Sequence, residues 1–89
     1  MKSVRRTLQF KRDVKRMQRQ GKDVVKLKRV LEGLVEGEEL EVELRDHVLV
    51  GQYKGTRECD IETDWLLIYE SAKSDIVLIR TGSHSDLFR

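Results

Sequence analysis

Three polar clusters of the chain contain the side chains that could carry chemistry. They are Arg45-Asp46-His47, the run from Lys54 to Asp60 with Asp64 and Trp65 behind it, and the run from Arg80 to Phe88. Metal-free RNA cleavage needs a base for the ribose 2′-OH proton, an acid for the leaving 5′-oxygen, and cations for the phosphorane-like transition state. The clusters hold both histidines, His47 and His84, and histidine suits both proton transfers because its pKa lies near neutrality.

Each candidate also has an ordinary structural explanation. A lone histidine is more often a hydrogen-bonding residue of the fold than a catalyst, Asp64 could cap a turn before a hydrophobic strand, and Phe88 could be core. A zinc site is an alternative use of four side chains: His47, His84, Asp60 and Asp64. No close ligand pair such as HxxxH supports that site.

Three cations of the second half could meet a phosphate: Lys54, Arg57 and Arg80. We expect them, like the candidate acids and histidines, at strand ends or in loops around a sheet. Cys59 is the single cysteine, so an intramolecular disulfide is excluded. Strand alternation places Cys59 on the opposite face from Glu58 and Asp60, which predicts core packing.

Two helices are predicted in the first half. Over residues 9–20 the apolar positions Phe10, Val14 and Met17 share one helical face, and Gly21 is a plausible stop. A second helix over residues 23–35 aligns Val24, Leu27, Leu31 and Leu34, with Asp23 at its start and Gly37 after its end.

Strands account for most of the remainder. Residues 2–8 fit a short edge strand, and residues 52–61, 64–70 and 75–80 fit three more. WLLIY and IVLI predict strands buried on both faces, and the turn-sized SAKS joins the last two as an antiparallel hairpin. The sequence therefore predicts one α+β domain over residues 1–89, with a helical hairpin packed on a small, mainly antiparallel sheet. The acidic run from Glu36 to Glu43 reads as a solvated loop, away from any RNA site.

Charge divides the chain sharply. Residues 1–30 hold twelve Lys/Arg against two acids, a net of +10, whereas residues 31–89 hold six against fourteen, a net of −8. The basic part suggests a polyanionic partner, with solvated helix faces as the alternative. The cations that we expect to contact RNA phosphates include Lys11, Arg12, Lys15 and Arg16. No apolar run is long enough to span a membrane and no secretory signal is recognisable, so a reducing cytosol is the expected compartment.

Ordered motifs along nearly the whole chain resemble the YafQ-like branch of the RelE/ParE toxin superfamily. F-K-R-D-V-K-R from Phe10, with G-K-D at Gly21, is similar to the N-terminal helix of these toxins. Four more motifs follow in order: R-D-H-x-L-x-G from Arg45, K-G-x-R-E-C from Lys54, D-W-L-L-I-Y from Asp64 and R-T-G-S-H-S-D-L-F from Arg80.

The resemblance implies a RelE/ParE-like fold and an mRNA endonuclease that acts within the ribosome. Such an enzyme needs no metal or other cofactor and leaves a 2′,3′-cyclic phosphate or a 3′-phosphate. It also implies a cognate DinJ/RelB-like antitoxin, a toxin that is monomeric alone and heteromeric with it, and no membrane partner. His47, Asp64, His84 and Phe88 match catalytic positions. Arg57 and Arg80 fall at basic positions near the site, and Glu58 at a commonly acidic one.

One departure from the family pattern bears on activity. The family has R-E-C-H-I-x-P-D-W where this chain has R-E-C-D-I-E-T-D-W, so Asp60 occupies the place of a catalytic histidine. Val48 and Thr63 replace two family prolines. An aspartate does not supply an imidazolium near pH 7, and it adds negative charge beside a phosphate. Three explanations stay open: redistributed chemistry, reduced activity, or a deliberate inactivating change.

Two other functions compete with the nuclease. A catalytically weak or silent module on the same fold could bind antitoxin or ribosome without cutting, and Asp60 motivates that reading. A ParE-like gyrase inhibitor is disfavoured, because ParE-like chains generally lack the histidines at the positions of His47 and His84.

Overall fold

The two predicted helices form where the apolar spacing places them. The computed structural model describes residues 2–37, 47–48 and 55–88. Helix α1 spans Leu8–Arg19 and is capped by Thr7, whose side chain accepts a hydrogen bond from the Phe10 N–H. Helix α2 spans Val24–Glu36, begins after Asp23 as its N-cap, and ends at Gly37, whose φ of 77° is the left-handed conformation that glycine tolerates. Both helices are confirmed to within one residue at each end.

Five strands of the described residues form one mixed sheet. They are β1 (Ser3–Arg6), β2 (His47–Val48), β3 (Arg57–Glu62), β4 (Trp65–Ser71) and β5 (Asp75–Gly82), in the order β1-β5-β4-β3-β2. β1 pairs parallel with β5, and the other neighbours are antiparallel. The edge strand, the β4–β5 hairpin and the mainly antiparallel sheet are thus confirmed. β3 starts later than the predicted residue 52, at Arg57.

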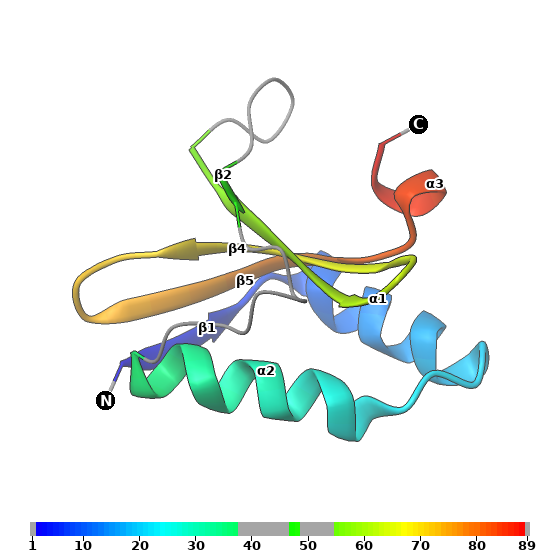
Figure 1. The fold of residues 1–89 in the computed structure, drawn as a ribbon, viewed down its shortest axis with the longest axis horizontal. Coiled ribbons are helices and arrows are strands. Elements are labelled where there is room, and N and C mark those ends of the chain that lie inside the picture. The colour runs from blue at the N-terminus through cyan, green and yellow to red at the C-terminus, as the bar shows by residue number, and fades with distance from the viewer. Residues whose placement is uncertain (1, 38–46, 49–54, 89) are drawn as a thin grey trace.

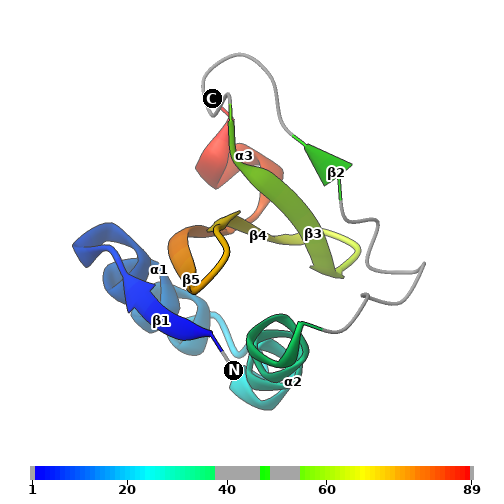
Figure 2. The same cartoon turned by 90° about the vertical axis from the view of Figure 1, so that its left-hand side faces the viewer.

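Helices α1 and α2 cover one face of the sheet, and a short helix α3 (His84–Leu87) lies on the other (Figures 1 and 2). The main core fills the helix side, where Phe10, Met17 and Leu27 pack against residues of the sheet that include Cys59, Trp65, Leu67 and Tyr69. A smaller cluster of Leu66, Ile68 and Leu87 lies under α3. β4 is therefore buried on both faces, and Cys59 is core, as predicted.

Beyond the end of β1, the edge of β5 forms hydrogen bonds with side chains of α1 and of its N-cap residue. The β1–β5 register ends at Leu78. Beyond it, Thr7 Oγ1 donates to the Ile79 carbonyl (2.8 Å) and Arg16 Nη2 donates to the Thr81 carbonyl (3.0 Å). The Thr81 N–H in turn donates to Asp13 Oδ2 (3.2 Å). The exposed edge that would otherwise invite pairing with another chain is closed by a helix.

Some predicted features lie at other places in the structure than expected, and others lie outside the described residues. Asp60 and Arg80 lie inside β3 and β5, so their predicted placement at strand ends or in loops is wrong. The acidic run from residue 38 onward, the Arg45-Asp46 pair and Lys54 lie outside the described residues. Within the part of the chain that the structure describes, no helix has the length and apolar character needed to cross a membrane.

Candidate active site

His84 and Asp64 form a hydrogen-bonded pair on the surface. The ring Nδ1 of His84 lies 2.8 Å from Asp64 Oδ1, and the His84 backbone N–H donates to the same oxygen over 3.0 Å. Both side chains are 62% exposed. An ionised carboxylate only accepts, so the neutral ring carries its hydrogen on Nδ1 and presents Nε2 for proton exchange. Two candidate residues twenty positions apart are thus brought into contact.

The same contacts set the charge of Asp64. The hydrogen bond from the His84 backbone N–H, followed by the bond from the His84 ring, holds the pKa of Asp64 below its ordinary value of 3.8. The carboxylate is therefore ionised near neutral pH. It can orient the imidazole and stabilise the imidazolium whenever the ring is protonated.

Buried hydrogen bonds behind the pair fix its two backbone segments. Trp65 follows Asp64 and is fully buried, and its Nε1–H donates to Thr81 Oγ1 over 2.9 Å. The Thr81 hydroxyl donates to the Leu66 carbonyl over 2.7 Å. The start of β4 is thereby joined to the end of β5. The packed interior between β4 and β5 therefore sets the separation of Asp64 and His84.

Helix α3 is held at both ends. Ser83 and Asp86 form a capping box, in which the Ser83 side chain accepts from the Asp86 N–H and the Asp86 side chain accepts from the Ser83 N–H. Leu87 is buried against Leu66 and Ile68. Phe88 stays 39% exposed, with its ring centroid 6.4 Å from that of His84 at an interplanar angle of 40°. The predicted residues His84, Asp64 and Phe88 therefore lie together.

Two acids of β3 lie on the α3 side of the sheet. Asp60 is opposite Leu66 and Glu58 is opposite Ile68 in the β3–β4 register, and directly opposed residues of an antiparallel pair share a face. Asp60 is half-buried and Glu58 is buried. The register pairs His47 of β2 with Glu58; the side chain of His47 lies outside the described residues. Asp60 thus belongs to the face that carries His84.

Asp13 is a residue that sequence reasoning missed. It is fully buried and forms ion pairs with Arg80 (2.9 Å) and Arg16 (2.8 Å). Burial raises the pKa of Asp13, but hydrogen bonds from Arg80, Gln9, the Thr81 N–H and Arg16 together outweigh it, and the net pKa is lowered. A signal was present in the sequence. Asp13 falls between Phe10 and Met17 on the apolar face of α1, where an acid needs buried partners.

The cations predicted to meet phosphate divide into two groups. Lys11, Arg12 and Lys15 are exposed along α1. The side chains of Arg16 and Arg80 are only 26% and 22% exposed and are paired with Asp13. Arg57 is half-buried at the start of β3. The surface cations of α1 are therefore distinct from the ordered guanidinium groups next to the sheet.

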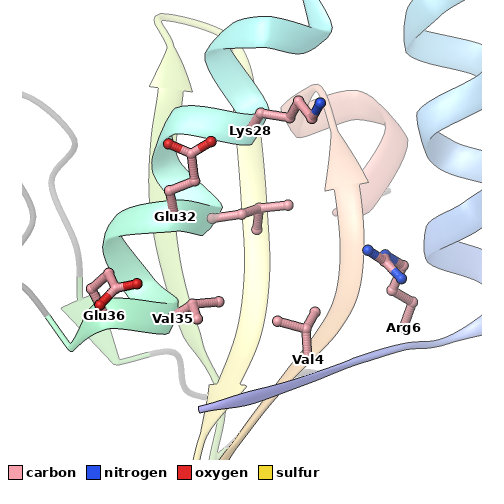
Figure 3. A pocket seen from close by; sticks show the side chains of 7 residues that line it. Val4, Arg6, Lys28, Glu32, Val35 and Glu36 are labelled. Carbon is pink, nitrogen blue, oxygen red and sulfur yellow. The ribbon is translucent and has the colours of Figure 1, made fainter. Parts of the chain in front are cut away.

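Among the described side chains, no three potential metal ligands come together. The side chain of His47, one of the four residues of the alternative zinc site, lies outside them. A groove of about 250 Å³ lies between β1 and α2. Val4, Leu31 and Val35 line it, together with four charged side chains: Arg6, Lys28, Glu32 and Glu36 (Figure 3). No histidine lines this groove. Helix α2, which forms one of its walls, lies on the opposite side of the sheet from α3 (Figure 1), so we do not assign the chemistry to it.

Comparisons with known proteins agree with this architecture. The family model described as bacterial toxin of type II toxin–antitoxin system, YafQ, matches residues 2–89. The chain is 38% identical over 81 residues to the mRNA interferase toxin YafQ of Escherichia coli K12, covering 90% of this chain and 88% of that protein. The crystal structure of YafQ from E. coli BL21(DE3) superposes with a TM-score of 0.95 at 33% identity, covering both chains fully. A chain of the E. coli DinJ–YafQ complex gives 0.93 at 34%, again with full coverage of both.

Proposed function

Because the chain belongs to the YafQ family of bacterial toxins of type II toxin–antitoxin systems, we propose that it is a ribosome-dependent mRNA endonuclease. Cleavage proceeds by general acid–base chemistry through the ribose 2′-OH. The observation that carries the proposal is the exposed His84–Asp64 pair beside Phe88. The pair offers an imidazole with one nitrogen oriented and the other directed to proton exchange.

The reaction is an in-line transfer at phosphorus. A base removes the proton of the ribose 2′-OH, the 2′-oxygen bonds to phosphorus, and the bond from phosphorus to the 5′-oxygen breaks. His84 Nε2 donates the proton that the leaving 5′-oxygen takes up, while Asp64 stabilises the imidazolium before transfer. His47 is the proposed base, and Arg57, Arg80 and Lys54 stabilise the phosphorane-like charge. The products are a 2′,3′-cyclic phosphate and a 5′-hydroxyl.

Asp60 makes reduced activity part of the proposal. It lies on the face that carries His84, where the family pattern has a histidine, and an aspartate there supplies no imidazole and repels the phosphate. The second candidate function, a weak or silent module that binds antitoxin or ribosome, rests on this same residue.

The proposed partners of this protein follow from its surface charge and from its family. A DinJ-like antitoxin is the proposed protein partner, because a relative forms a complex with DinJ. The exposed cations Lys11, Arg12 and Lys15 of α1 would contact ribosomal RNA. An acidic antitoxin segment on the same surface would block that contact.

A translation extract programmed with a defined message tests the proposal. The parent protein should release fragments with 2′,3′-cyclic or 3′-phosphate ends. His84→Gln keeps a hydrogen-bonding group of similar reach but cannot transfer the proton, so its rate should fall by at least about a hundredfold. Ser85→Ala, on the same exposed helix, is the matched control and should cut at the parent rate.

Two outcomes go against the proposal. Cleavage by His84→Gln at the parent rate would remove His84 as the general acid. A parent protein that binds ribosomes or antitoxin but releases no fragments would instead support the silent module.

A further inference from the structure

The fully buried carboxylate of Asp13 joins α1 to the part of β5 that leads into α3. Oδ1 of Asp13 accepts hydrogen bonds from Arg16 Nη1 (2.8 Å), Gln9 Nε2 (3.1 Å) and Arg80 Nη2 (3.1 Å). Oδ2 accepts from Arg80 Nε (2.9 Å) and from the Thr81 N–H (3.2 Å). A buried ionised group persists only with such partners. Here those partners come from α1 itself and from the segment of β5 that leads into α3.

The contact with Arg80 fixes a guanidinium plane. Nε and Nη2 of Arg80 each meet a different oxygen of Asp13, which is the two-point geometry that orients an arginine. The Arg80 side chain remains 22% exposed, and Arg80 precedes His84 by four residues. An oriented guanidinium can stabilise the negative charge of a scissile phosphate.

Arg16 extends the cluster to α3. Its Nη2 donates to the Thr81 carbonyl over 3.0 Å and lies 3.5 Å from Asp86 Oδ2. Asp86 also closes the capping box at the start of α3. Gly82 lies between these groups, and a Cβ there would come within 2.6 Å of Arg16 Nη2. The position of α3 above the sheet therefore depends on a cluster centred on Asp13.

We propose that Asp13 is a positioning residue for RNA cleavage. It holds Arg80 in one orientation and α3 in one place, so that His84 keeps a fixed geometry toward the scissile phosphate. This inference rests on the proposed function, and Asp13 itself touches no reacting atom.

Two matched variants test the inference. Asp13→Asn keeps the shape of the side chain but removes the charge that orders both arginines. Asp23→Asn is the control, because asparagine caps a helix as well as aspartate and Asp23 caps α2. The readouts are single-turnover cleavage at varied ribosome concentration and the NMR signals of the His84 ring, which are assigned with His84→Gln.

For Asp13→Asn we expect the maximal cleavage rate to fall by about a hundredfold, the cost of a small misplacement of catalytic groups. KM should change little, because the exposed cations of α1 are kept, and the His84 ring signals should shift. Asp23→Asn should leave all three quantities unchanged. Parent-like His84 signals and a parent-like rate in folded Asp13→Asn would overturn the inference. A change in KM alone would also overturn it, because Asp13 would then act in binding.

A further variant covers the case in which Asp13→Asn does not fold. Arg80→Lys keeps a cation on a partly exposed side chain but loses the two-point contact, and the same loss of rate and shift of His84 signals is expected. Unchanged rate and signals in Arg80→Lys would equally overturn the inference. If the parent protein cuts no RNA, the proposed function fails, whereas the His84 signals still decide whether Asp13 positions α3.

Discussion

Asp60 is the residue at which the sequence motifs predict a departure from the family pattern. Its backbone is opposite Leu66, and Leu66 packs with Leu87 of α3, so the Asp60 carboxylate shares a face with the His84–Asp64 pair. The pKa of Asp64 is already lowered by its bonds to His84. A further carboxylate on the same face adds negative charge that opposes an incoming phosphate.

Replacement of Asp60 by histidine should therefore raise cleavage. Asp60→His restores a group that exchanges protons near pH 7, and such groups contribute on the order of a hundredfold or more. Asp60→Asn is the matched control, because it removes the charge without supplying a proton donor. Initial cleavage rates in a translation extract separate the two effects. If Asp60→His is no faster than Asp60→Asn, charge and not proton transfer limits the parent.

At the scale of elements, α3 depends on close packing at the residue before its cap. Gly82 lies against α1 and α3, and a Cβ at this position would be 2.6 Å from Arg16 Nη2 and 3.0 Å from Asp86 Cβ. Neither group can move without loosening the cap of α3 or the contacts of Asp13. Position 82 therefore needs glycine, because a Cβ has no room between Arg16 and Asp86.

Gly82→Ala should accordingly displace α3 and its histidine. Overpacking of this kind costs roughly 1–3 kcal/mol, which chemical denaturation measures. The cleavage rate should fall by more than the loss of stability alone explains, because the His84–Asp64 distance changes. Ser85→Ala, which adds no bulk to the interior, serves as the reference. A Gly82→Ala protein with parent stability and parent rate would show that the space around Gly82 is not limiting.

Helix α1 presents a second, separable feature, its exposed cations. Replacing Lys11, Arg12 and Lys15 with Gln should weaken ribosome co-sedimentation. It should also flatten the dependence of binding on salt, because a protein that makes fewer phosphate contacts releases fewer counterions on binding. Arg16 is left intact, since it holds Asp13 and α3. Lys73→Gln, at the exposed β4–β5 turn, is the control. Binding that is insensitive to salt and to the triple change would contradict the assignment of this surface.

At the scale of the whole molecule, Asp13 links the helix layer to the α3 side through β5. Its folded-state pKa is lowered from 3.8. A carboxylate of this kind contributes stability that is fully present above the unfolded pKa and is lost as pH falls through the lower folded value. The contribution is therefore intact at neutral pH and disappears in acid, below about pH 4.

Asp13→Asn should lower the free energy of unfolding at pH 7 by roughly 2–3 kcal/mol, the scale of hydrogen bonds to a charged group. The variant and the parent should converge in stability below the acid window in which Asp13 titrates. Urea unfolding at a series of pH values measures both curves, with Asp23→Asn as the reference. A stability gap that stays constant down to pH 2 would mean that the charge of Asp13 does not stabilise the fold.

Local sequence patterns predict the two long helices, the edge strand and the central strands, whereas they do not predict β2 or α3. The spacing of Phe10 and Met17, the cap at Asp23 and the stop at Gly37 bounded both helices, and the WLLIY and IVLI runs located the central strands. These signals are local, because a helix or strand is set by neighbours within a few residues. The motifs likewise point to His84, Asp64 and Phe88, which lie together in the structure.

Which charges are buried and which elements meet depends on how the whole chain packs. The sequence predicts that Arg16 contacts RNA phosphates together with Lys15, but packing of α1 on the edge of β5 turns Arg16 toward Asp13 and Thr81. The contacts of Asp13 with Arg80 span 67 residues of chain, and the parallel pairing of β1 with β5 joins positions about as far apart. No local pattern encodes such contacts, because they exist only when the whole core has closed and a buried carboxylate must find its partners.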